Sequence, residues 1–350
     1  MPARPMSCTF VSHVADPLAV ARGFVATKVH SALGGPPELL EEYRTPPGDP
    51  GLFGPGSAVW QVHGDLPAML VGGISSLMLQ SLHPAAMAGV DEHSRYRDDP
   101  LGRLRRTTRF VAGTTFGGLG LVETLVDEVR RIHRRVRGTT AQGTAYAADD
   151  PALLTWVHVA EVWSFLRSYQ RYGTRPLLRS EKDRYLDRTA EIAVLLGACE
   201  VPRSVEQVRS YLQAVRGDLA ATPAALEAVR FLRTPLSDGV TDRLAHHAIV
   251  DAAVDLLPGF ARRELALPDR GMLERGRVRA TMTSVAAVLR WGLGPSPVVG
   301  VATQRALASS VEHRRAQAVD QHSVESSANT GPGSRALPAG RAELRDATEG

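Results

Sequence analysis

Cysteine is scarce in this chain of 350 residues, which holds only Cys8 and Cys199. Two cysteines cannot build a disulfide scaffold or a thiolate metal site. Lysine is equally rare (Lys28 and Lys182), so arginine carries nearly all the positive charge. Aromatic residues make up 5% of the chain, which is too few for the stacking surface of a nucleic-acid-binding protein. We therefore expect a protein of the reducing cytoplasm that does not bind nucleic acid.

A secretion signal and a membrane span are also lacking. The N-terminal segment MPARPMSCTFVSHVADP has no apolar core of signal length. The most apolar stretch, LPAMLVGGISSLMLQSL at 66–82, is short for a bilayer and is interrupted by glycine, serine and glutamine. We interpret it as a buried core helix and predict no integral membrane span.

Helix signals dominate what remains. Asp65, Asp99 and Asp150 each precede a proline by one or two positions, the pattern of a capped helix start. The chain has no series of alternating strands and no repeat of fixed period. The sequence predicts an all-α fold with one large helical domain at 56–318. An N-terminal helix with a Pro/Gly-rich loop at 1–55 precedes it, and a disordered tail at 319–350 follows it.

The segment 98–138 organises this prediction as two helices joined by a glycine-rich turn. In the first helix, Arg103, Arg106, Thr107 and Phe110 recur at steps of three and four residues and share a face. The second helix, predicted to end at Gly138, carries an apolar stripe with a histidine in it. That stripe comprises Val122, Val126, Val129, His133 and Val136. An imidazole on an apolar face is what a buried metal or haem iron uses.

Other polar residues lie next to predicted buried helices. His83 closes the apolar helix, and Glu92 and His93 follow it. His83 is either a site residue or a helix-end histidine that bonds a carbonyl. His158 and Glu161 lie three residues apart on one face of a long apolar helix. They form either a structural pair or two metal ligands.

Several phrases together resemble the family of the latex clearing protein (rubber oxygenase) and the ER-bound oxygenase MpaB. They are LQSLHPAAMAGVDEHSRYRDDPLGRLRRT, TFGG, VRRIHRRVRGT, ADDPALLTWVHVAEVWSF and SYQRYG. The resemblance covers about residues 56–300 and is densest between His83 and Tyr172. It implies an all-helical oxygenase, and its rubber-cleaving members carry haem b.

The resemblance also implies roles for single residues. His133 in RRIHRRVRG matches the proximal haem ligand, the single metal ligand that we predict. Arg103, Arg106 and Thr107 match the family's distal Arg-x-x-Lys-Thr segment, with arginine in place of lysine at 106. That lysine can serve as a sixth iron ligand, whereas arginine stays protonated and cannot. The distal iron position is therefore expected to be open to dioxygen or water.

The remaining assignments are less direct. Glu92 is the nearest candidate for the family's distal glutamate. His83 and His158 are candidates for further cofactor contacts. Together these residues predict a haem-type pocket between helices, with Arg103, Arg106, Thr107 and Glu92 in catalytic positions.

The sequence thus predicts a haem-dependent oxygenase that uses dioxygen on an apolar terpenoid, lipid or natural-product substrate. Two alternatives remain open. One is a non-haem iron oxidoreductase with His83, His133, His158 and Glu161 as ligands. The other is a non-catalytic helical binding protein. The sequence does not indicate the oligomeric state.

Overall fold

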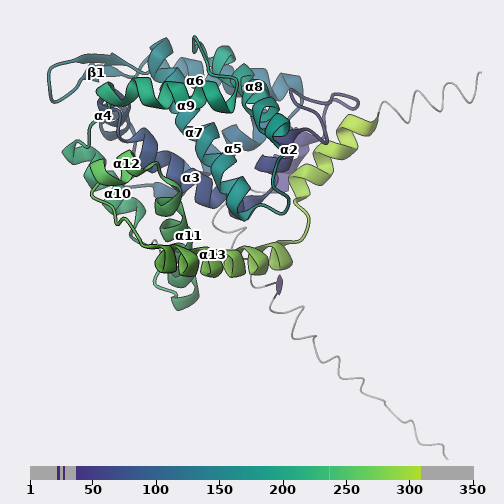
Figure 1. Ribbon diagram of the computed structural model, residues 1–350. Coiled ribbons are helices and arrows are strands. Elements are labelled where there is room, and N and C mark those ends of the chain that lie inside the picture. The colour runs from purple at the N-terminus through teal and green to yellow at the C-terminus, as the bar shows by residue number, and fades with distance from the viewer. Residues whose placement is uncertain (1–21, 24–26, 28–36, 236, 309–350) are drawn as a thin grey trace, which may run out of the picture. The chain divides into compact units, whose positions relative to one another are not determined.

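The computed structural model describes residues 22, 23, 27, 37–235 and 237–308, and these are almost entirely helical (Figure 1). The predicted helix near 15–32 lies largely outside the described residues, and the predicted tail at 319–350 lies wholly outside them. A 3-10 helix, η1 (Pro37–Tyr43), comes first. The α-helices are α2 (Ala58–His63), α3 (Leu66–Gln80), α4 (Pro84–His93), α5 (Pro100–Phe116), α6 (Leu119–His133), α7 (Pro151–Tyr172), α8 (Arg179–Leu196), α9 (Val205–Ala214), α10 (Pro223–Leu232), α11 (Val240–Leu256), α12 (Gly259–Glu264) and α13 (Met272–Leu293). A second 3-10 helix, η2 (Val215–Asp218), and a last described helix, Pro297–Ala308, complete the set.

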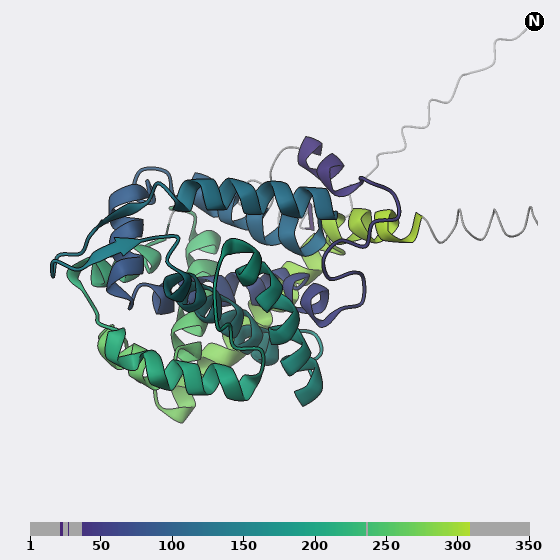
Figure 2. The ribbon, with the colours of Figure 1, turned by 90° about the horizontal axis from the view of Figure 1, so that it is seen from above.

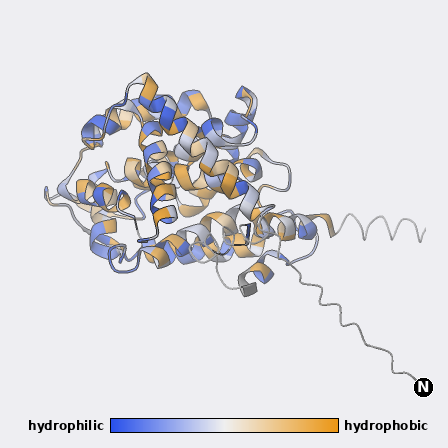
Figure 3. Ribbon diagram, turned by 90° about the horizontal axis from the view of Figure 1, so that it is seen from below, coloured by the Kyte–Doolittle hydropathy of each residue, from blue (hydrophilic) through white to orange (hydrophobic). Residues whose placement is uncertain are grey.

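The core is built on α3 and α7, which pack along each other. Gly72 of α3 lies against the backbone and ring of Phe165, so a side chain at this position would force the helices apart. Ser168 donates a hydrogen bond of 2.6 Å from its hydroxyl to the Ala68 carbonyl across the same contact. Figure 3 colours the ribbon by hydropathy, and the buried residues of both helices are mostly apolar. The all-α prediction and the buried apolar helix are therefore confirmed.

The predicted caps form as expected. The Asp65 carboxylate accepts from the Ala68 N–H, that of Asp99 from Gly102, and that of Asp150 from Ala152 and Leu153. These bonds satisfy N–H groups that have no partner inside the helix. Three of the helices that carry candidate site residues or form the core, α3, α5 and α7, thus begin where local chemistry places them.

The predicted hairpin of 98–138 consists of α5 and α6, which lie side by side in Figures 1 and 2. One part of the prediction was wrong, because α6 ends at His133 and not at Gly138. Strand β1 (Arg137–Thr139) then pairs antiparallel with β2 (Ala145–Ala147). Thr140 and Thr144 close the turn through backbone and side-chain bonds, and Gly143 supplies a φ of 85°. The segment that follows α6 is therefore a short β-hairpin.

Two further helices begin without a side-chain cap at the N-cap residue. The chain after His83 forms α4, whose first residue is a proline. Helix α8 begins after Leu178, whose N–H donates to the Glu181 carboxylate at 2.7 Å. A carboxylate three residues into a helix can satisfy a first-turn N–H as a cap side chain does.

The Pro/Gly-rich loop before α2 is tied to distant parts of the domain. The Arg305 guanidinium donates to the carbonyls of Tyr43 and Asp49 at 2.9 and 2.8 Å. The Asp49 carboxylate in turn accepts from the N–H of Leu119, at the start of α6. This loop thus joins the α5–α6 turn to the last described helix.

Among the described residues, no single helix is long and apolar enough to cross a membrane. Two pairs of consecutive helices have the length and composition of a membrane span, but the helices of each pair meet at bends of 106° and 59°. The first pair contains α3, whose apolar residues are buried against α7.

Candidate functional site

A histidine outside the predicted site residues links three helices of the domain. His63 ends α2, with its Nδ1 2.7 Å from Thr115 Oγ1 of α5 and its Nε2 3.0 Å from Tyr185 Oη of α8. Its ring also meets the edges of Tyr185 and Phe165. Burial lowers the pKa of His63 to about 3, with a smaller contribution from His158. The ring is therefore neutral, donating at one nitrogen and accepting at the other.

His158 and Glu161 of α7 lie close to this histidine. Burial lowers the pKa of His158 to about 4 and raises the pKa of Glu161 to about 7. Burial, and to a smaller extent the charge of Glu161, raises the pKa of Tyr185. No hydrogen bond joins His158 to Glu161 in the described part of the chain, so the structural pair considered from the sequence does not form.

The Glu161 carboxylate combines burial with a lack of polar partners. It has no hydrogen-bond or ion-pair partner among the described residues. Its oxygens keep some solvent-accessible area, although burial raises its pKa to about 7. We call His63, His158, Glu161 and Tyr185 the interior polar group.

His133 continues the buried stripe of α6 at the end of the helix. Val122 and Val126 are buried, Val129 and His133 are half-buried, and burial lowers the pKa of His133. Neither ring nitrogen has a hydrogen-bond partner among the described residues, and neither is sealed from solvent. The neutral ring therefore offers an accessible electron pair, as an iron ligand must. The remaining stripe residue, Val136, lies beyond the helix, where its side chain is close to Gly89 of α4.

The candidate residues of α5 do not share one environment. Arg103 is half-buried and donates to the Ser94 hydroxyl, and burial lowers its pKa. Arg106 and Thr107 are exposed. The Arg106 guanidinium is 3.4 Å from the Asp99 carboxylate, and the Thr107 hydroxyl donates to the Arg103 carbonyl. Since α5 and α6 run antiparallel around a short turn, Arg103 and His133 both lie at the open end of the hairpin.

Glu92 and His83 lie at the two ends of α4. The Glu92 carboxylate accepts a bond of 2.6 Å from the Tyr146 hydroxyl, which ties α4 to β2. The ring centroids of His83 and Trp156 are 6.2 Å apart. The Nδ1 atom of His83 is buried and has no hydrogen-bond partner among the described residues. Burial lowers the pKa of His83, against the charges of Asp218 and Asp150. The catalytic role of Glu92 and the cofactor role of His83 stay predictions.

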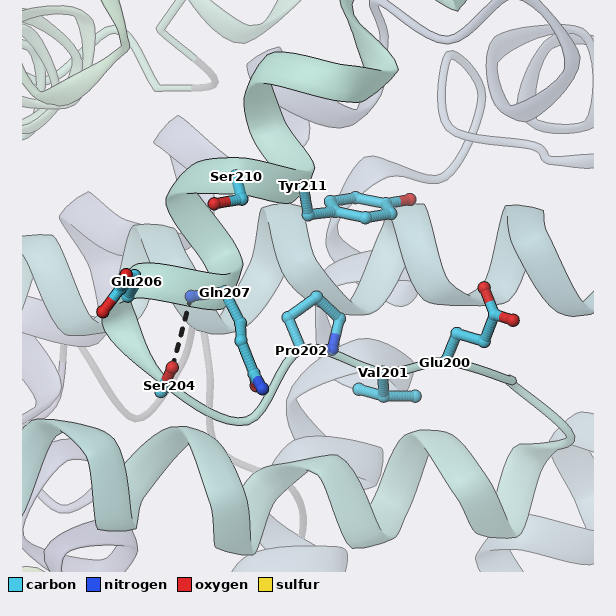
Figure 4. Close-up of a pocket in the computed structure, with 8 residues that line it drawn as sticks. All are labelled: Glu200, Val201, Pro202, Ser204, Glu206, Gln207, Ser210 and Tyr211. Atoms are coloured by element: carbon cyan, nitrogen blue, oxygen red, sulfur yellow. Dashed lines mark hydrogen bonds between the residues drawn. The ribbon is translucent and has the colours of Figure 1, made fainter.

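The haem-type pocket predicted between helices stays a prediction. At the turn end of the hairpin, Gly113 of α5 is in direct contact with the Leu125 side chain of α6, so a planar group would have to lie toward the open end. A hollow of about 740 Å³ lies elsewhere, at the start of α9 (Figure 4). None of the predicted site residues lines it, and its lining residues are Glu200, Val201, Pro202, Ser204, Glu206, Gln207, Ser210 and Tyr211.

The non-haem alternative finds no support in the described part of the chain. It contains no group of three or more His, Cys, Asp or Glu side chains placed to hold a metal ion. His83 lies beside Trp156 and His158 beside His63, so the four residues of that alternative belong to different surroundings.

The fold and these residues agree with one class of protein, the helical oxygenases. Residues 60–291 match the family described as ER-bound oxygenase mpaB/B'/Rubber oxygenase, catalytic domain, and the chain belongs to this family. Comparison with curated proteins and with solved structures gave no significant match. The predicted resemblance is therefore confirmed, and the chain is an oxygenase-type oxidoreductase. The predicted domain at 56–318 contains the whole matched region.

Proposed function

We propose that this oxygenase depends on haem b, with His133 as the proximal iron ligand, and that it acts with dioxygen on an apolar substrate. The observation that supports the ligand is the half-buried, neutral and unpartnered ring of His133 on the inner stripe of α6. Haem supplies oxygen activation when it is bound, and the protein sets access and orientation. The residues at this end of the hairpin fit such a group, because one neutral imidazole and one half-buried guanidinium are available.

Arg103 is the cation suited to a propionate carboxylate. It is half-buried, and the described residues give it only a hydroxyl as a partner. An arginine in such surroundings binds a carboxylate strongly, since charge-assisted bonds contribute about 1.5–3 kcal/mol. Arg106 is already close to Asp99, so Arg103 is the better candidate.

Glu161 is the interior group suited to moving a proton. Its pKa of about 7 lets it hold or release a proton near neutral pH. We propose it as a proton donor or acceptor of the interior polar group, whereas Glu92 is exposed and already bonded to Tyr146. The surrounding α7 is apolar on most of its circumference, which favours a terpenoid, lipid or natural-product substrate.

The test is the absorption spectrum of the purified protein, followed by pyridine haemochrome analysis. We expect a Soret band and about one haem b per chain. His133→Gly should lose both, and free imidazole added during haemin reconstitution should restore them. The matched control is His247→Ala, because His247 is exposed on α11.

The proposal fails if the wild-type protein binds no haem after reconstitution with haemin. It also fails if His133→Gly binds haem as well as the wild type with an unchanged spectrum. Circular dichroism of each variant shows whether the helical fold is retained.

A further inference from the structure

A second hollow, of about 290 Å³, opens on a different side of α7 from Glu161. Gln170, which lines it, follows Glu161 by nine residues, about half a turn further round the helix. The walls come from α7, α8, α9 and α11, elements far apart in sequence. None of the residues assigned above to haem or to proton transfer lines this hollow.

The hollow is lined by four cations: Arg167, Arg171, Lys182 and Arg209. No aspartate or glutamate lines it. In the described part of the chain none of the four forms an ion pair; Arg167 has only the Trp163 ring, 5.8 Å from its guanidinium carbon. The acids nearby in sequence are engaged elsewhere, because Asp255 is paired with Arg270 and Asp183 accepts from the Val205 N–H.

The electrostatic setting of Arg167 agrees with this geometry. Burial lowers its pKa, and the positive charges of Arg171 and Arg209 lower it further. A guanidinium nevertheless stays protonated in proteins. Like charges held together without a counter-charge destabilise a fold, and an anion in the hollow relieves that repulsion.

The same hollow contains an unsatisfied amide and an apolar wall. The side-chain nitrogen of Gln170, Nε2, is buried and has no hydrogen-bond acceptor among the described residues. The side-chain oxygen also has no partner among the described residues, but it keeps some solvent-accessible area. Turning the amide by 180° exchanges the two atoms and points the donor into the hollow. Trp163 and three aliphatic side chains form the rest of the lining.

We propose that this hollow binds a small anionic molecule with a phosphate-type head group and a short apolar body. Four cations around one hollow, of which Arg171 and Arg209 are exposed, favour a head group with two or more negative charges over a single carboxylate. Arginine binds two phosphate oxygens at once, and the indole and aliphatic wall takes the apolar part. The site is separate from the haem proposal and does not depend on it.

The experiment is isothermal titration calorimetry on the full chain as purified, with hexyl phosphate and with inorganic phosphate as probes. We expect saturable one-to-one binding of hexyl phosphate, tighter than that of inorganic phosphate. The double variant Arg167→Gln/Arg209→Gln should weaken hexyl phosphate binding by about ten-fold or more. Arg277→Gln, an exposed arginine of α13, is the matched control and should change the affinity less than two-fold.

Three results would overturn the proposal. The first is the absence of saturable binding by either probe. The second is an equal loss in the Arg277→Gln control, which would mark a general charge effect. The third is equal affinity for the two probes, which would exclude the apolar part of the ligand. The His133→Gly variant, with or without bound haem, should bind hexyl phosphate like the wild type. This result separates the phosphate test from the haem test.

Discussion

Helix α7 presents two faces of opposite character. The interior face carries Glu161 and His158, whose burial favours the uncharged form of each group. The other face carries Arg167 and Arg171, which remain cationic beside an open hollow. One helix therefore separates a neutral interior, suited to apolar chemistry, from a charged hollow suited to an anion. The difference arises because carboxyls and imidazoles can give up their charge on burial, while guanidinium groups cannot.

The largest expected effect comes from removing the ring of His63, which packs against Phe165 of α7. His63→Ala removes a ring that joins Thr115 to Tyr185 and leaves two hydroxyls without that partner. We expect a loss of about 2–4 kcal/mol in the free energy of unfolding at pH 7, measured in urea. His247→Ala should lose less than about 0.5 kcal/mol. Equal losses in the two variants would contradict the central role of His63.

Glu161→Gln is expected to show the next largest effect, and one that depends on pH. The pKa of Glu161 rises from 4.5 to about 7 on folding, so the unfolded chain ionises first as the pH rises. The stability contributed by the protonated form is complete below pH 4.5 and is lost as the pH rises toward 7. The variant should therefore be more stable than the wild type by about 2–3 kcal/mol at pH 8, with no such gain at pH 4.5. A gain of equal size at both values would contradict the shifted pKa.

Arg167→Gln should change the free energy of unfolding less, and it should not lower it as a core mutation does. Removing one of several neighbouring cations is expected to leave stability unchanged or raise it by up to about 1 kcal/mol at low salt. The effect should shrink with added salt and stay constant from pH 5 to pH 9, because arginine does not titrate there. A clear loss of stability would show that Arg167 is a structural residue.

Thr107→Val should have the smallest effect on stability, within about 0.5 kcal/mol in urea. Its exposed hydroxyl bonds only the Arg103 carbonyl one turn earlier. A larger loss would mean that the hydroxyl stabilises α5. With stability unchanged, a loss of oxygenase activity in this variant would come from the site itself.

Much of the fold could be predicted because its signals are local. Asp65, Asp99 and Asp150 cap helices through bonds to residues two or three positions later. The inner stripe of α6 also follows from spacing, and it leads to His133. The β-hairpin after His133 was missed because its pairing depends on a turn at Gly143 that the helical pattern hides.

The interior of the site was not predictable in the same way. His63 ends a helix of six residues, and its partners are 52 and 122 positions away. No spacing rule links residues at such separations. The raised pKa of Glu161 likewise depends on burial by neighbouring helices, which no local pattern reports.

The order of residues alone determined where α3, α5 and α7 begin, that the protein is helical, and which family it belongs to. These properties depend on contacts within one or two helical turns, or on short sequence motifs that can be found without a structure. The packing of α2, α5, α7 and α8 decided which groups lose their charge and which keep it. Desolvation and distant hydrogen bonds are properties of the folded interior, so they arise only when those helices meet.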